Sequence, residues 1–269
     1  MIPNNLIINA DDFGLDAASS LGIWHCAQEG LINSISVMAF QNSFQNELFQ
    51  RLIQNHPQIK IGVHLCLFEG ETLPLSFKNL YGKNENPNYK DFLKLYLLGK
   101  IKRGDVYTEW KNQIEVIKSQ LLPGQHLSHL DSHQHIHMLP GLWPIILRLQ
   151  KEFDIPRIRI PYESISRSIF KSFPFGSLLQ ILAKLRWTNE QSRLIGFSGS
   201  SHFTLAPNKK ALYAVKKHPD CLFELMVHPV LSPNHKEIPD FENKLSFGGV
   251  ERQNEIVELR QLSAFLDKL

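Results

Sequence analysis

Short apolar runs, each of a length suited to one buried strand, alternate along this chain with longer stretches of helical periodicity. Strands that alternate with helices are joined by right-handed crossovers, so the strands of such a chain run parallel. The alternation predicts an α/β fold, and seven candidate strands favour an irregular (β/α) barrel over a doubly wound sheet. The predicted strands are residues 6–10, 34–40, 59–65, 126–131, 157–161, 193–198 and 222–228.

Amphipathic stretches fill the intervals between most of these strands. In the first interval, Asp16 is a suitable N-cap and Gly30 a suitable stop for one helix. Residues 105–121 place apolar side chains three or four residues apart, as the buried stripe of a helix requires. The predicted helices are residues 16–30, 43–55, 105–121, 208–217 and 251–266.

Two segments break the alternation. Residues 68–100 are rich in turn-forming and aromatic residues, and residues 163–192 mix apolar with basic side chains. Because the length suits one α/β barrel, we expect a single domain over residues 1–269 with these two segments as insertions. The first insertion could cap a site. The second leaves peripheral contact with a membrane open, although a helix packed on the barrel explains it equally well.

The composition argues against several other classes of protein. No uninterrupted apolar run reaches the length of about 18 residues that a membrane span needs, and the N-terminus lacks the basic region of a signal peptide, so we expect a cytoplasmic protein. A net charge of +3 is too slight to indicate a nucleic-acid partner. The three cysteines are widely spaced and form neither a disulfide framework nor a zinc knuckle. We also expect a homo-oligomer, namely a dimer.

Metal-competent side chains stand at the ends of four predicted strands. The carboxyl ends of parallel barrel strands share one face, so residues far apart in the sequence converge there. The pattern therefore predicts one site rather than scattered polar residues. Its candidate members are Asp11 and Asp12 after the first strand, His64, Asp131 with His133, and His228.

Adjacent aspartates at a strand end can serve two functions. Successive side chains diverge there, so one carboxylate could bind a metal while its neighbour faces the substrate water. Asp11 and Asp12 fit this description. An acidic capping pair before the helix at Asp16 explains the dipeptide equally well.

The run LDSHQHIH is the strongest single signal. Asp131, His133, His135 and His137 alternate and would share one side if the strand continued. Neutral imidazole is the commonest protein ligand for transition metals, and only one or two of these histidines need bind one. The others could orient ligands or contact substrate. A solvated polar loop is a weaker explanation, because apolar sequence borders the run on both sides.

Three further residues gain meaning only from their strand-end positions. His64 alone would be read as a buried core histidine. His228, just before Pro229, could give a proton to a leaving group or could simply cap its strand. Arg159 could orient a catalytic carboxylate, whereas Arg157 is better explained as a surface ion pair.

The ordered motifs INADDFGL, IGVHLCL, HLDSHQHIHMLP, RIPYE and ELMVHP resemble those of the YdjC-like carbohydrate deacetylases, a family with ChbG-like and HpnK-like branches. The resemblance spans about residues 5–230. It implies an irregular barrel of the glycoside hydrolase/deacetylase type and a hydrolase that removes the N-acetyl group from an amino sugar or chitooligosaccharide-like substrate, releasing acetate. RIPYE is closer to the HpnK-like branch, which leaves a lipid-linked glycan open.

The resemblance also implies roles for individual residues. Asp12, His64 and His133 would hold one divalent metal ion, Asp11 would be the general base and His228 the general acid. Magnesium is the cofactor usually assigned to the family, although one aspartate with two histidines also suits zinc. The residues expected to contact substrate or to support the ligands are Asp131, His135, His137 and Arg159.

Two other functional classes remain open from the residues. Metal-dependent phosphoesterases and amidohydrolases also collect His and Asp at strand ends, but they usually carry an HxH pair after the first strand, where this chain has ADD. A non-catalytic sugar-binding protein would not need an acid, a base and a metal together.

Overall fold

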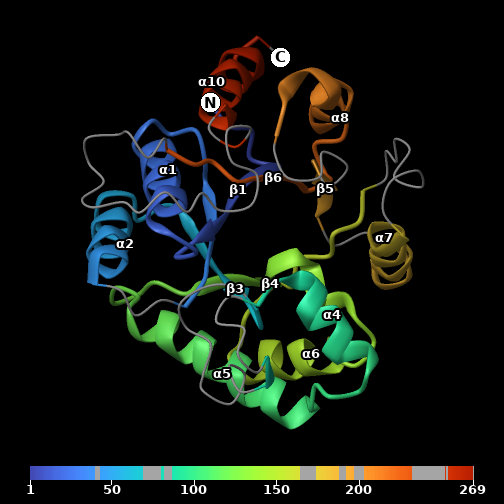
Figure 1. Ribbon diagram of the computed structural model, residues 1–269. Helices are drawn as coiled ribbons and strands as arrows, with labels where there is room; N and C mark the ends of the chain where they lie inside the picture. Colours follow the sequence, from blue (N-terminus) through green and yellow to red (C-terminus); the bar gives the residue numbers. More distant parts are fainter. Residues whose placement is uncertain are drawn as a thin grey trace.

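The computed structural model describes residues 1–39, 43–68, 80–81, 87–163, 174–187, 192–196, 203–231, 252 and 254–268. Within them, six parallel strands form one curled sheet in the order β4-β3-β2-β1-β6-β5, with helices around its outside (Figure 1). The strands are β1 (Leu6–Phe13), β2 (Ser34–Val37), β3 (Lys60–Leu65), β4 (Leu127–Ser132), β5 (Arg193–Ile195) and β6 (Phe223–Val227). The parallel α/β class predicted from the alternation is confirmed.

β1 lies inside the sheet and is buried along its whole length, as is usual for a parallel strand covered on both faces. Residues 6–10 of β1 pair in register with residues 223–227 of β6. On the other side, Asn9 and Ala10 pair with Ser34 and Ile35 of β2. The first and last regular strands of the sequence are therefore neighbours, which brings the two ends of the chain to the same site.

The segment 157–161, the remaining predicted strand, makes only an isolated bridge to β4. The Arg159 N–H donates to the Leu130 carbonyl at 2.9 Å, while the Leu194 N–H of β5 donates to the Tyr162 carbonyl at 3.1 Å. Prolines at both ends of the segment remove backbone donors and prevent a longer ladder. The described sheet thus has six strands, and this segment contacts both of its edges.

Among the described residues, the five predicted helices are found, one with its predicted bounds and four with shifted ends, and three further helices were not predicted. The new helices are α4, which lies in the expected insertion 68–100, α6, and α7 in the expected insertion 163–192. Among the described helices, none combines the length and apolar character required to cross a membrane. The helices are α1 (Ala17–Gln28), α2 (Ser43–Asn55), α4 (Tyr89–Leu97), α5 (Arg103–Ser119), α6 (Trp143–Glu152), α7 (Pro174–Arg186), α8 (Leu205–Lys217) and α10 (Glu255–Leu266).

The two expected insertions are only partly covered by the described residues. Residues 69–79, 82–86, 164–173 and 188–191 lie outside them. A single domain with two insertions therefore stays a prediction.

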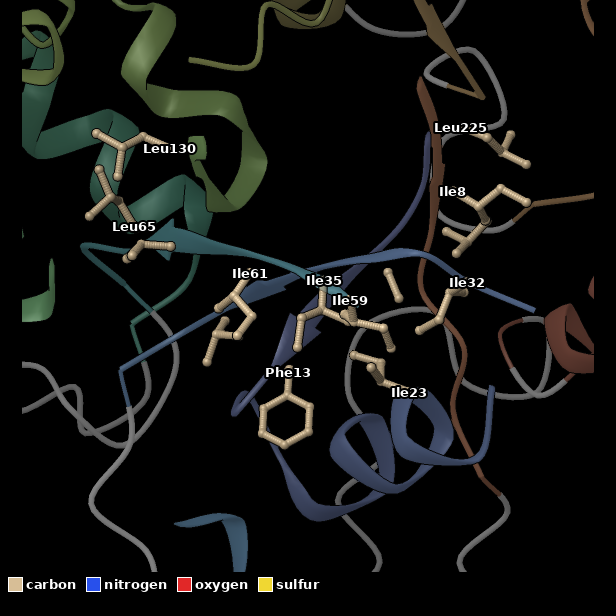
Figure 2. Close-up of a cluster of buried hydrophobic side chains, with 14 of the residues drawn as sticks. Ile8, Phe13, Ile23, Ile32, Ile35, Ile59, Ile61, Leu65, Leu130 and Leu225 are labelled. Carbon is tan, nitrogen blue, oxygen red and sulfur yellow. The ribbon is translucent and has the colours of Figure 1, made fainter. Parts of the chain in front are cut away.

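The core packs α1 directly against the sheet. Figure 2 shows Ile23 of α1 close to Phe13 and Ile35, and all three side chains are fully buried. A Cβ atom added to Gly22 would lie 2.4 Å from the Pro229 carbonyl oxygen, so the helix approaches the backbone beyond β6 as closely as glycine permits. This contact fixes α1 beside the end of β6, where His228 lies.

Candidate metal centre

An irregularity in β1 places both aspartates at the carboxyl edge of the sheet. The pairing of β1 with β2 shifts register between Ala10 and Phe13, and Asp12 has a left-handed backbone with φ of 73°. Aspartate is one of the few residues other than glycine that adopt this conformation readily. Bulges of this kind re-aim side chains beside functional sites. As a result, Asp11 and Asp12 contact two different sets of residues.

Asp12, His64 and His133 converge in a buried cluster. Asp12 Oδ1 lies 3.0 Å from His133 Nδ1 and 3.4 Å from His64 Nε2. One potential ligand atom from each residue lies within 4.8 Å of the others, and each residue is at most 3% exposed. Two imidazole nitrogens and one carboxylate oxygen at this spacing suit a divalent transition metal or zinc.

The outer contacts of His64 strengthen this assignment. Its Nδ1 lies 2.7 Å from Asp131 Oδ1, so the Nδ1–H donates to the carboxylate and Nε2 is turned toward Asp12. Histidines that bind metals usually donate their other ring N–H to a carboxylate or carbonyl in this way. His64 and Asp131 are register partners in the β3–β4 pair, so the sheet itself fixes the contact. The residues fit a divalent metal ion.

A second group, Asp11, His64 and Asp131, also brings ligand atoms within 4.8 Å. The guanidinium of Arg159 already lies between its two carboxylates, with Nη1 at 2.6 Å from an oxygen of each. A cation bound there would have to share the space with this buried positive charge. The cluster around Asp12 is therefore the better metal site.

Arg159 holds Asp11 through two parallel bonds. Nη1 donates to Oδ2 at 2.6 Å and Nη2 donates to Oδ1 at 2.8 Å. The Asn9 amide donates to the same Oδ1 at 2.6 Å. Arg159 is fully buried, and its Nε also donates to Glu224 at 2.5 Å. A bidentate pair of this kind fixes the plane of the carboxylate as well as its position.

Burial and neighbouring charges act differently on the two aspartates. Burial raises the pKa of Asp11 above its ordinary value, although the charge of Arg159 opposes this effect. For Asp12, burial is outweighed by His133 and other donors, which hold its pKa well below the ordinary range. The pKa of Asp131 is also held well below its ordinary range, because Arg159 and His64 outweigh burial. Asp11 is thus the more basic of the two adjacent carboxylates.

The alternation of Asp131, His133, His135 and His137 does not continue as a strand. β4 ends at Ser132, and a 3-10 segment, η1 (His133–Met138), follows. Within it, φ is 55° at Gln134 and 54° at His135, which turns the chain away from the strand direction. These side chains would share one side only if the strand continued, and it does not.

The histidines of η1 consequently have separate surroundings. His133 joins Asp12, whereas His137 Nε2 donates to the Arg159 carbonyl at 2.9 Å and its Nδ1 lies 2.6 Å from Ser132 Oγ. His137 therefore supports the backbone of Arg159. His135 is 8% exposed, and its ring packs edge-on to His137 at 6.4 Å between centroids.

His228 lies at the end of β6 and is half-buried. Its backbone N–H donates to Glu255 Oε2 at 2.5 Å. Burial, together with the charge of Arg252, holds the pKa of His228 well below its ordinary value. The charge of Asp12 acts on the same pKa, so His228 lies within electrostatic range of the Asp12 cluster.

Several residues of the site were not predicted from the sequence. Ser36 of β2 donates to Asp131 at 2.7 Å, accepts from Asn9 at 2.8 Å and lies 3.0 Å from His129 Nε2. A polar residue inside an apolar strand is the signal that would have indicated Ser36, Asn9 and also Glu224. Arg157 pairs with Glu224 and Ser192 and is only partly exposed, so it is not a simple surface pair.

The C-terminal part of the chain contributes two more residues that no local pattern indicated, Arg252 before α10 and Glu255 at the start of α10. Arg252 Nη1 donates to Asp12 Oδ2 at 3.0 Å across 240 residues of sequence. Glu255 is fully buried and accepts the backbone N–H groups of His228 and of Phe203 at 2.5 and 2.7 Å.

A parallel α/β sheet with a buried Asp/His cluster at its carboxyl edge defines a class of proteins in which that cluster could hold a metal ion. Within that class, the model of the YdjC-like protein family matches residues 5–266, and the chain belongs to this family. A protein of Enterococcus faecalis V583, described as a candidate cellobiose-phosphate cleavage protein, has the same fold. The TM-score is 0.64 at 22% identity, over 98% of this chain and 94% of that one.

Two curated relatives match part of the chain. A carbohydrate deacetylase of Vibrio parahaemolyticus is 36% identical over 151 residues, which are 56% of this chain and 57% of the relative. A carbohydrate deacetylase of Halalkalibacterium halodurans is 35% identical over 155 residues, 56% of this chain and 62% of the relative. The matched part thus spans less than two thirds of either relative.

Proposed function

We propose that this protein is a metal-dependent hydrolase that removes the N-acetyl group from an acetylated carbohydrate and releases acetate. The observation that carries the proposal is the pairing of two neighbouring groups. A rigidly held, unusually basic carboxylate, Asp11, adjoins a buried cluster of metal ligands, Asp12, His64 and His133. Membership in the YdjC-like family and relatives named carbohydrate deacetylase support the same activity.

Asp12, His64 and His133 would hold the cation. A divalent metal there supplies a Lewis acid that polarises an amide carbonyl and makes water more acidic. We expect Mg²⁺ from the family resemblance. The two imidazole donors suit Zn²⁺ equally well, so both ions belong in any test.

The proton transfers are assigned to residues on two sides of the cluster. Asp11 takes the proton from the attacking water, and the bonds from Arg159 and Asn9 hold its carboxylate in one orientation during that step. His228, which its surroundings keep neutral at rest, would take up the proton released in that step and pass it to the departing amine. Water adds to the acetyl carbon, the amide C–N bond breaks, and the products are acetate and a free amino sugar.

The test is acetate release from a panel of N-acetylated mono- and oligosaccharides, with and without chelator. We expect the wild-type protein to release acetate, to lose this activity on chelation and to regain it when cation is added. The rate of release should fall at least about 100-fold in His133→Ala and Asp11→Asn. His218→Ala, at the exposed end of α8, is the matched control and should retain activity. Release that persists in His133→Ala would contradict the proposal.

A lipid-linked glycan is a second candidate substrate. α7 exposes Leu178, Ile181 and Leu185 at 43%, 52% and 78%, next to exposed Lys184. These apolar residues are spaced at three and four positions, so they share one helix face, and lysine beside them favours an anionic lipid surface. Leu185→Ser should then lower activity on a lipid-linked substrate while sparing soluble sugars. Equal loss on both kinds of substrate would contradict this assignment.

A further inference from the structure

The two oxygens of the Asp12 carboxylate have different partners. Oδ1 faces His133 Nδ1 and His64 Nε2, the other members of the ligand cluster. Oδ2 accepts a bond of 3.0 Å from Arg252 Nη1. One carboxylate is therefore shared between a candidate cation site and a permanent positive charge, and Arg252 is only 3% exposed.

The fold anchors Arg252 firmly in this position. Three residues further on, Glu255 accepts the backbone N–H groups of His228 and Phe203, which ties the start of α10 to the end of β6. β6 pairs in register with β1, the strand that carries Asp12. Asp12 itself is held in a left-handed backbone conformation. Asp12 is thus fixed by β1, and Glu255, three residues after Arg252, is tied to the end of β6.

We infer that Arg252 is a positioning residue that limits Asp12 to one ligating oxygen and weakens the negative charge which that oxygen presents to the cation. This inference rests on the proposed function. A carboxylate that offers one oxygen leaves more coordination positions for water and for a carbonyl group. A less neutralised cation is also the stronger Lewis acid. The arginine accordingly lowers affinity for the metal and raises the rate of the chemical step.

A purely structural ion pair would behave differently. If Arg252 only fastened the chain before α10 to β1, its removal would loosen the ligand cluster and weaken both metal binding and activity. The positioning role predicts that metal binding becomes tighter while activity falls. Binding becomes tighter because the removal of a positive charge near the site favours the cation. Cation affinity is therefore the decisive measurement, and it does not depend on substrate.

The experiment compares the affinity of wild-type protein, Arg252→Gln and Arg252→Met for Zn²⁺ and Mg²⁺ by competition with a chromophoric chelator. We expect both variants to bind Zn²⁺ at least about 10-fold more tightly than the wild type, because each removes a positive charge close to the cation. With saturating metal, kcat should fall about 10-fold or more while KM changes little. Gln keeps a donor for Asp12, so that variant is expected to fold even if the Met variant does not. The visible spectrum of the Co²⁺-loaded protein should also change, because the set of ligating oxygens changes.

Two further variants separate charge from geometry. Arg252→Lys keeps the positive charge, so its Zn²⁺ affinity should stay within about 3-fold of the wild type. Arg260→Gln removes an exposed arginine of α10 that pairs with Glu29, and it should change neither affinity nor kcat.

The outcomes distinguish this inference from the proposed function. Weaker or unchanged Zn²⁺ binding in Arg252→Gln, with an active wild type, overturns the role of Arg252 alone. A wild type that binds the cations but releases no acetate from any substrate overturns the deacetylase, while the affinities still decide the effect of Arg252 on Asp12. A wild type that binds neither cation overturns both.

Discussion

A buried carboxylate behind the site makes stability depend on pH in a defined direction. Glu109 of α5 is 3% exposed, and its Oε1 accepts a bond of 2.5 Å from the Gln113 amide. The same amide group donates to the Cys66 carbonyl at 2.7 Å, while Gln113 Oε1 accepts the Cys66 N–H at 2.9 Å. Cys66 is two residues beyond His64, so these hydrogen bonds hold the end of β3 in place.

The size of the effect follows from the pKa of Glu109. Burial raises this pKa from 4.5 to about 7. The folded protein therefore binds the proton more tightly than the unfolded chain does. The resulting stability is fully present below pH 4.5 and is lost as the pH rises through about 7. At about 1.4 kcal/mol for each pKa unit, the total loss is about 3 kcal/mol.

Glu109→Gln removes the titration and keeps the shape of the side chain. The free energy of unfolding, measured with urea at several values between about pH 5 and pH 8, should therefore fall in the wild type relative to the variant by about 2 to 3 kcal/mol. Glu115→Gln is the matched control, since Glu115 lies on the same helix and its side chain is 53% exposed. It should follow the wild-type curve. Parallel curves for the wild type and Glu109→Gln would refute the reasoning.

Three further perturbations test the site and its supports. Gly62→Ala would place a Cβ 2.2 Å from the buried His129 ring, so the free energy of unfolding, measured by thermal unfolding, should fall by about 2 to 3 kcal/mol. Gly104→Ala meets nothing within 4 Å and should cost nothing. Equal stabilities of the two variants would contradict the steric argument. Arg159→Lys cannot make the bidentate bond to Asp11, so kcat should fall on the order of 100-fold in a folded protein, and an unchanged kcat would show that the bond is dispensable. Removal of metal by a chelator should lower Tm as well as activity, and added Zn²⁺ or Mg²⁺ should restore both; a Tm indifferent to metal would count against a buried cation.

The sequence was most informative where local patterns determine structure. Apolar runs between helical stretches predict buried parallel strands because both faces of such strands are covered, and six of the seven predicted strands form the sheet. The convergence of Asp12, His64 and His133 followed from the shared edge of parallel strands, without knowledge of their distances.

Other features depend on contacts that no local pattern encodes. The strand 126–131 was predicted nearly to its end, but the sequence did not reveal the course of the chain beyond it, where left-handed residues at Gln134 and His135 redirect the backbone. Arg252 lies 240 residues from its partner Asp12 and has no neighbouring motif. Its role arises from the fold, since only the packing of the C-terminal part of the chain brings it to the site.

The distribution of charge along the chain has a consequence for how the protein is made. The acidic and imidazole groups Asp11, Asp12, His64 and Asp131 all belong to the first half of the chain, whereas their counter-charges Arg159 and Arg252 come later. A nascent chain that ends before Arg159 would have to bury three carboxylates without either arginine, which is unfavourable. The first half should consequently not reach its native packing during synthesis until the second half has left the ribosome. An amino-terminal fragment should for the same reason require its complementary fragment in order to fold.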